Sequence, residues 1–176
     1  MKLGAQLYTL RKQMQTPDEI EHGLERIAKM GYSCVQISGI GKIDAQRLRA
    51  VCDRLSLEIA VTHIPSDRLL GDTARVIEEH KIMDCRYVGL GSMPKGYRSA
   101  AGVDEFKQYF TRAIEELRAA DLEFTYHNHA FEFERTGGSL IFDRLLKAFS
   151  PEQMKVTLDC YWVNYGGADV CDWIDR

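Results

Sequence analysis

Hydrophobic side chains along the chain follow two periods that alternate. Short runs of contiguous or alternating apolar residues are each followed by a longer segment in which apolar residues recur every three or four positions. Residues 16–31 show the longer period with recognisable ends. Thr16, Pro17 and Glu19 supply an N-cap, a first-turn proline and a capping box, and Gly31 follows the last turn. The pattern predicts short strands that alternate with amphipathic helices.

Strand and helix alternate about six times, with a period near 30 residues. We expect strands at residues 2–10, 34–40, 58–65, 87–93, 123–129 and 155–163. We expect helices at residues 16–31, 44–56, 68–84, 103–121, 139–150 and from 168 onward. Strands that alternate with helices of this length form βαβ units, in which the strands lie parallel. The sequence therefore predicts one α/β domain over residues 1–176.

Two architectures suit such a chain, an open doubly wound sheet and a closed barrel. Polar side chains recur at the ends of nearly every expected strand; the set is Gln6, Tyr8, His63, Ser92, His127, His129, Asp159 and Trp162. A barrel draws functional residues from the ends of several strands, whereas an open sheet gathers its ligands near one switch point. The distribution favours a (β/α)8 TIM-barrel type of fold, here with only about six βα units. Gly39 and Gly41 lack the third glycine of a dinucleotide-binding fingerprint, so we interpret them as a plain turn.

Charge and composition exclude several classes of partner. The formal net charge is -3 and no block of lysine and arginine stands out, which argues against nucleic acid and membrane as partners. The first residues lack the apolar core of a signal peptide, and no stretch is long enough to span a bilayer. The five cysteines are widely spaced without a CxxC pair, so we expect reduced thiols in a cytoplasmic protein. Of these, Cys34, Cys52 and Cys160 are most simply small core residues.

His127, His129 and Asp159 are expected to meet at the strand ends. The side chains of a strand alternate between its faces, so His127 and His129 share one face, while Asp159 ends the neighbouring strand. Glu132 follows on a loop from which it could fold back over the same point. A group of imidazoles and carboxylates suits a divalent cation such as Mn²⁺, Mg²⁺, Co²⁺ or Zn²⁺.

Several of these residues also have a purely structural interpretation. Glu132 could be a solvated loop residue, and His63 could cap the helix that follows it. Trp162 either packs in the core or forms an apolar plate for a sugar ring, and we favour the plate. His22 and His80 fall on the expected helix surfaces, and we assign them no role.

Four features together resemble a known family. They are QLYTLR near the N-terminus, the histidine of the third strand, YHNHAFEF, and LDCYWVNYGGAD. The combination resembles the xylose-isomerase-like sugar phosphate isomerase/epimerase family, a TIM-barrel group within the AP endonuclease family 2 superfamily. That group also holds tagatose and psicose 3-epimerases, inosose dehydratase and endonuclease IV. The resemblance runs over the whole chain, and YHNHAFEF and LDCYWVNYGGAD are its specific parts.

The resemblance implies a metal site built from several strands. In the family, a glutamate ends the fifth strand and an aspartate ends the sixth, and later strands add a histidine and a second glutamate. Asp159 matches the aspartate. The fifth strand departs from the commoner Glu-Asn-His pattern, because here it carries His127, Asn128 and His129. Either His127 replaces the glutamate as a ligand, or Glu132 supplies the carboxylate.

The resemblance also implies an enzyme that moves a proton on a small sugar. We expect a divalent-metal-dependent isomerase or epimerase of a keto or aldo sugar, or of a sugar phosphate, acting through a metal-stabilised enediolate. The expected roles are metal binding by Asp159, His127 and Glu132, proton transfer by His129, His63 and Glu132, and substrate binding by Gln6, Tyr8, Asn128 and Trp162. Alternatives are a keto-sugar or inosose dehydratase or lyase, a non-catalytic fragment or subunit, and an abasic-site endonuclease. We also expect a homo-oligomer.

The length departs from the family as well. Eight βα units take about 250 residues, whereas this sequence has 176 and stops just after its sixth expected strand. Six strands would leave two open edges. We therefore expect a truncated chain, or a barrel that a partner completes.

Overall fold

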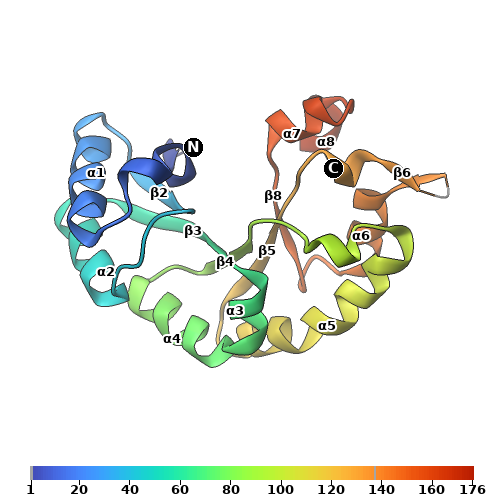
Figure 1. Cartoon of the computed structure of the whole chain (residues 1–176), viewed down its shortest axis with the longest axis horizontal. Coiled ribbons are helices and arrows are strands. Elements are labelled where there is room, and N and C mark those ends of the chain that lie inside the picture. The colour runs from blue at the N-terminus through green and yellow to red at the C-terminus, as the bar shows by residue number, and fades with distance from the viewer. Residues whose placement is uncertain (1, 137) are drawn as a thin grey trace. The chain divides into compact units, whose positions relative to one another are not determined.

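Six strands form one hydrogen-bonded sheet in the order β1-β2-β3-β4-β5-β8. The computed structural model describes residues 2–136 and 138–176. The strands are β1 (Gly4–Gln6), β2 (Cys34–Ile37), β3 (Glu58–Ile64), β4 (Tyr87–Leu90), β5 (Glu123–His127) and β8 (Lys155–Thr157) (Figure 1). The pairs β1–β2, β2–β3 and β5–β8 are parallel. A separate antiparallel pair is formed by β6 (Arg135–Thr136) and β7 (Ser139–Leu140).

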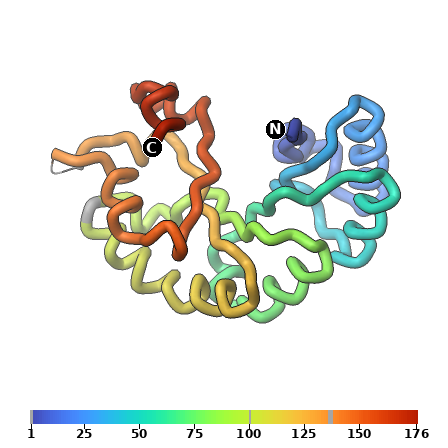
Figure 2. Tube along the Cα trace, turned by 180° about the vertical axis from the view of Figure 1, so that it is seen from behind, coloured from blue at the N-terminus to red at the C-terminus, as the bar shows by residue number. Residues whose placement is uncertain are grey.

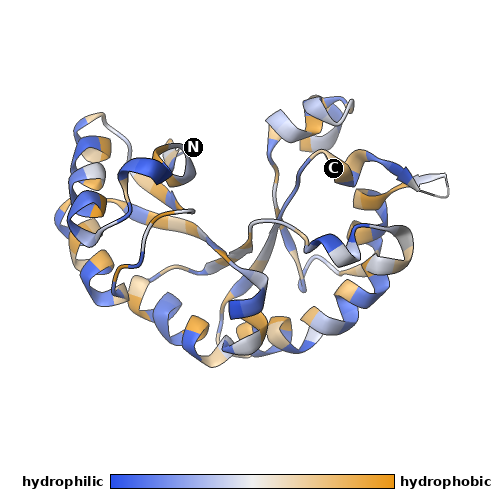
Figure 3. Ribbon diagram, viewed as in Figure 1, coloured by the Kyte–Doolittle hydropathy of each residue, from blue (hydrophilic) through white to orange (hydrophobic). Residues whose placement is uncertain are grey.

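Helices separate the consecutive strands of the sheet. They are α1 (Pro17–Lys29), α2 (Ala45–Arg54), α3 (Ser66–Gly71), α4 (Thr73–Met83), α5 (Ala100–Ala119), α6 (Ile141–Ala148), α7 (Cys160–Tyr165) and α8 (Val170–Ile174). Short 3₁₀ helices lie at Leu7–Gln13, Lys95–Tyr97 and Phe131–Phe133. In Figure 3 the longer helices carry hydrophobic and hydrophilic residues on different sides, as the sequence period requires. The predicted α/β alternation of about six βα units is confirmed.

The chain divides into two compact units, which are described in turn. The first contains the residues up to Ile64 together with Ala74–Val88, and the second contains Pro65–Thr73 together with Gly89–Arg176. Our prediction of one domain over residues 1–176 stays a prediction.

In the first unit, α1 and α2 pack on the sheet through aliphatic side chains. Leu24, Val35 and Cys52 are among the fully buried members of this core. The predicted capping box of α1 is confirmed, because Thr16 Oγ1 accepts from the Glu19 amide and the Glu19 carboxylate accepts from the Thr16 amide. These reciprocal bonds fix the start of α1.

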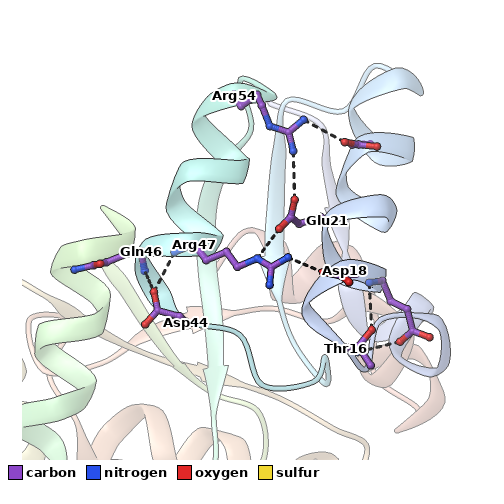
Figure 4. Close-up of polar contacts among 9 residues, drawn as sticks. Thr16, Asp18, Glu21, Asp44, Gln46, Arg47 and Arg54 are labelled. Atoms are coloured by element: carbon purple, nitrogen blue, oxygen red, sulfur yellow. Dashed lines mark hydrogen bonds and ion pairs between the residues drawn. The ribbon is translucent and has the colours of Figure 1, made fainter.

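On the surface of the first unit, an arginine joins two helices (Figure 4). Arg47 of α2 donates to Asp18 at 2.7 Å and to Glu21 at 2.6 Å, and both acceptors lie on α1. Arg54, the last residue of α2, forms ion pairs with Glu21 and Glu25. These charges are largely exposed, so we expect the network to add little to stability at physiological salt.

The second unit has an aromatic core. Phe106 and Phe110 of α5 stack at 4.2 Å, and Phe106 meets Tyr126 of β5 edge to face at 6.1 Å. Phe142 of α6 continues the cluster from Tyr126 to Trp173 of α8. The trace in Figure 2 shows the chain leaving β8 and passing directly into α7 and α8. The rigid aromatic core thus supports the ends of β5 and β8.

All six strands end earlier than the sequence predicts, and three of these ends bear on the candidate site residues. The first ends at Gln6, where a 3₁₀ helix takes over, and the fifth ends at His127. The sixth was expected to run to residue 163, but β8 ends at Thr157 and α7 begins at Cys160. The cause is Asp159, whose Oδ1 accepts from the Trp162 amide and caps the new helix. The helix expected at 68–84 is two helices, α3 and α4.

Two predictions about single residues are wrong. His80 was expected on a helix surface but is fully buried, with Nδ1 bonded to the Val76 carbonyl and Nε2 to the Thr62 hydroxyl. Cys160 was expected in the core but is exposed at the start of α7, because the strand expected there ends earlier. Cys34 and Cys52 are buried as predicted. Within the described residues, no helix combines the length and the apolar character needed to cross a bilayer.

Candidate active site

The segment at the end of β5 carries most of the candidate site. His127 is the last residue of the strand, and Asn128 and His129 continue it before the 3₁₀ helix Phe131–Phe133. Asp159 lies after β8, which pairs with β5 in parallel. Because parallel strands end at the same edge of a sheet, these residues come together. All of them belong to the second unit.

The His127 imidazole lies against the Asp159 carboxylate. Its Nε2 is 3.1 Å from Asp159 Oδ2, and its Nδ1 is 3.0 Å from the Gly91 carbonyl oxygen. A carbonyl oxygen can only accept, so Nδ1 must carry a proton. In the neutral tautomer with this proton, Nε2 would present a lone pair to a carboxylate oxygen. Two acceptors at this separation require either a second proton on the imidazole or a cation bound by both.

Asn128 fixes the backbone of Asp159. Its Oδ1 accepts from the Asp159 amide at 2.8 Å, and its Nδ2 donates to the Asp159 carbonyl at 3.1 Å. Asn128 is fully buried, and its side-chain amide makes both of these hydrogen bonds. These bonds position Asp159, and the expected role of Asn128 in substrate binding stays a prediction.

One ring nitrogen of His129 has no hydrogen-bond partner among the residues that the structure describes. This atom, Nδ1, is buried. Burial lowers the pKa of His129 to about 4, with smaller contributions from His127 and from the positive charge of Arg98. The ring is therefore neutral at pH 7. Its neighbours are the rings of His127 at 4.9 Å and Trp162 at 5.1 Å.

The Glu132 side chain is fully buried next to the backbone of His129. One oxygen accepts from the Tyr126 hydroxyl at 2.5 Å, and the other accepts from the His129 amide at 2.8 Å. Burial raises the pKa of Glu132 to about 7, although both hydrogen bonds oppose the shift. Its two oxygens hold the start of the 3₁₀ turn. The expectations that Glu132 binds metal or transfers a proton stay predictions.

Trp162 lies in the first turn of α7 and not at a strand end. Its ring is tilted toward His129 and meets the exposed ring of Tyr161 edge to face at 4.9 Å. The interpretation of Trp162 as a plate for a sugar ring stays a prediction.

Sequence reasoning missed Arg98. Its guanidinium lies 4.1 Å from the centre of the Phe131 ring, and Phe131 stacks on His129 at 6.2 Å. Nε donates to the Met93 carbonyl and a terminal nitrogen donates to the Ser92 hydroxyl, both at 2.9 Å. Arg98 lies in a loop after β4, well past the strand end where we looked for polar residues. The arginine in GSMPKGYRS has no spacing signal that would have marked it.

The other predicted residues belong to the first unit. His63 lies within β3, with Nε2 2.6 Å from the Gln36 amide nitrogen and Nδ1 3.2 Å from the Ser38 hydroxyl. Gln6 is the last residue of β1. Tyr8 is 49% exposed, with the Arg11 guanidinium 4.1 Å from its ring centre. Their roles in proton transfer and substrate binding stay predictions.

The residues at the end of β5 fit a divalent cation as a partial ligand set. Metal–ligand distances for imidazole and carboxylate are about 2.0–2.2 Å, so two such atoms at right angles on one ion lie about 3 Å apart. The separation of 3.1 Å between His127 Nε2 and Asp159 Oδ2 meets this condition. Donation of Nδ1–H to a backbone carbonyl is the usual support of a metal-binding histidine. Among the described residues no group of three such ligands occurs, so further ligands would have to complete the site.

No protein-family model and no curated protein sequence matches the chain. Solved structures match it closely in fold. A sugar phosphate isomerase/epimerase from Parabacteroides distasonis has a TM-score of 0.86 and 24% identity, over 99% of this chain and 70% of that one. A probable 3-DHS dehydratase from Bacillus anthracis has a TM-score of 0.73 and 14% identity, over 99% and 69%. An AP endonuclease of family 2 from Brucella melitensis has a TM-score of 0.73 and 15% identity, over 99% and 75%.

These likenesses concern the fold. They confirm that the chain resembles the predicted group of proteins in architecture, with about six βα units of the TIM-barrel type. Functions hosted by one fold differ, so the activity must be argued from the site.

Proposed function

We propose that the chain binds a divalent metal at His127 and Asp159 and serves a sugar isomerase or epimerase reaction. The observation that carries the proposal is the contact of 3.1 Å between His127 Nε2 and Asp159 Oδ2, with His127 Nδ1 held by the Gly91 carbonyl. The fold neighbours support the choice of reaction, since one of them carries the name sugar phosphate isomerase/epimerase.

The residues around this contact divide the work. A bound divalent cation would supply a positive charge that stabilises negative charge developing on the substrate oxygens. His127 and Asp159 hold it, and Asn128 keeps the Asp159 backbone in place through two hydrogen bonds. His129 is neutral and its ring lies 4.9 Å from that of His127, so it is the candidate base that accepts a proton from a carbon next to a carbonyl. Trp162, beside His129, offers an apolar face to the sugar ring.

Dehydration is a second candidate for the same site. The abstraction of a proton next to a carbonyl is shared by both reactions, and they differ in whether the proton returns or a neighbouring hydroxyl leaves. A fold neighbour named as a probable 3-DHS dehydratase supports keeping this candidate. The products separate the two, because only dehydration releases an unsaturated sugar.

Proton exchange with solvent tests the proposal. The protein is incubated in D₂O with Mn²⁺ and a panel of keto and aldo sugars, their phosphates and sugar acids, and deuterium incorporation next to the carbonyl is followed by NMR. We expect incorporation that falls by about 100-fold or more in His129→Gln, the scale of general-base catalysis. His22→Gln, on the exposed side of α1, is the matched control and should retain the rate. Absence of exchange with every sugar, or equal rates in both variants, would contradict the proposal.

A further inference from the structure

Arg98 forms no ion pair among the residues that the structure describes. The guanidinium is partly buried, with one face on Phe131. Both of its hydrogen-bond acceptors, the Met93 carbonyl and the Ser92 hydroxyl, are neutral. A buried charge is normally paired, because removal from water is costly without an opposite charge.

Arg98 is held in place and still has donors to offer. A guanidinium carries five N–H donors, and two of them are used in the bonds to Met93 and Ser92. Stacking on Phe131 and the two hydrogen bonds restrict the side chain to one orientation. A planar group with free donors and little freedom is suited to bind a carboxylate or a phosphate through two bonds.

Arg98 belongs to the surroundings of the candidate site. Its loop begins at Gly91, whose carbonyl holds His127 Nδ1, and Phe131 connects its guanidinium to the His129 ring. The guanidinium and the candidate site thus share the loop that follows β4 and the Phe131 ring.

We propose that Arg98 binds an anionic group of the substrate, a phosphate or a carboxylate. The inference rests on the proposed function, because it places the substrate at the His127–Asp159 contact. It goes beyond it in naming the substrate class, since a neutral sugar would leave the guanidinium unpaired. The substrate of this chain is then a sugar phosphate or a sugar acid.

Anion binding to the metal-free protein tests this without any need for activity. Inorganic phosphate and D-gluconate are titrated separately in EDTA while the Arg98 Nε–H signal is followed by NMR. We expect a saturable shift with at least one probe, and the probe that binds more tightly identifies the group. Arg98→Met should weaken that binding by about 10-fold or more, the value of charge-assisted hydrogen bonds. Arg98→Lys should show an intermediate loss, because it keeps the charge but not the planar fork.

Arg112→Met is the matched control. Arg112 lies on the exposed side of α5 with a side chain 89% exposed, and its removal changes the net charge by the same amount. We expect unchanged anion affinity in this variant. Equal affinity in Arg98→Met and the wild type, or a shift that sodium chloride reproduces, would overturn the inference. Metal binding by His127 and Asp159 is measured without anions, so failure of one proposal leaves the other standing.

Discussion

Asn128 and Glu132 lie on either side of His129, and both use their side chains on the backbone around it. Asn128 bonds the amide and carbonyl of Asp159, and Glu132 bonds the amide of His129 and the hydroxyl of Tyr126. In YHNHAFE, the two histidines therefore face the site, while the residues between and after them hold it together. Such supporting bonds orient ligands and raise their affinity for metal.

The pH dependence of stability tests the buried position of Glu132. Its pKa is raised to about 7 from 4.5, so the folded state holds a proton that the unfolded state has already released between these values. The contribution of Glu132 to stability is full below pH 4.5 and is lost as the pH rises through 7. Replacement by Gln removes this loss. Glu132→Gln should therefore gain about 2–3 kcal/mol of unfolding free energy relative to wild type between pH 4.5 and pH 8.

The comparison must be made as a difference between variants at each pH. His129 acts with the opposite sign, because its pKa is lowered to about 4 and its contribution is lost as the pH falls from 6.5. Urea denaturation in EDTA gives the unfolding free energies. Glu134→Gln, in the same segment but exposed, is the matched control. A difference between Glu132→Gln and wild type that stays flat with pH, or changes in the other direction, would contradict the burial described here.

At the residue scale, the sequence predicts which residues meet at the site better than it predicts the role of each. The period of two along β5 and the position of Asp159 after the neighbouring strand were enough to bring His127 and Asp159 together. The burial of Glu132 was not predicted, because a carboxylate in a polar loop gives no sign that the Tyr126 hydroxyl will bond it. Arg98 gave no signal, since its significance depends on its having no ion pair among the described residues, which only coordinates reveal.

Among the elements, the junction between β8 and α7 depends on the side chain of Asn128, the residue that follows β5. The two bonds from Asn128 fix Asp159, and Asp159 in turn caps α7 through the Trp162 amide. The end of one strand, the start of one helix and a candidate metal ligand are thus coupled. Loss of the Asn128 side chain should disturb all three.

Asn128→Ala should lower the unfolding free energy by about 1–3 kcal/mol, because it leaves the part-buried Asp159 amide without its partner. The Asp159 carbonyl loses one donor and keeps the Val163 amide. Asn164→Ala, exposed on α7, is the matched control and should change it by less than about 0.5 kcal/mol. Urea denaturation of both variants measures the difference. A loss below about 1 kcal/mol in Asn128→Ala would show that the clamp does not hold the junction.

The starts of α1 and α2 were predicted well, whereas the ends of the strands were predicted poorly. Caps depend on local contacts, such as the capping box of Thr16 and Glu19, and these are readable from spacing. The end of β8 depends on Asp159, which reads equally well as a strand residue and as an N-cap. The apolar sequence from Cys160 to Val163 favoured the strand, but only Val163 of these is buried. The hydrogen bonds from Asn128 to the Asp159 backbone favour the helix start over a longer strand.

For the whole molecule, repeated alternation of strand and helix was enough to predict the fold class. The match at a TM-score of 0.86 to a sugar phosphate isomerase/epimerase is reached at 24% identity, so the pattern and not the individual residues carries the fold. The same pattern does not define a metal site. His127 and Asp159 provide two ligands, and no group of three occurs in the described part of the chain.

The most direct test of the account is the affinity of the protein for Mn²⁺, measured by calorimetric titration of wild type, Asp159→Asn and Asp169→Asn. Asparagine remains a good N-cap, so Asp159→Asn should leave α7 intact while removing a charged ligand. Asp169 caps α8 through the Cys171 and Asp172 amides and has no histidine partner among the described residues, which makes it the matched control. We predict that Asp159→Asn weakens binding by more than about 10-fold and that Asp169→Asn leaves it unchanged. Equal affinity in all three proteins would contradict a metal site at His127 and Asp159.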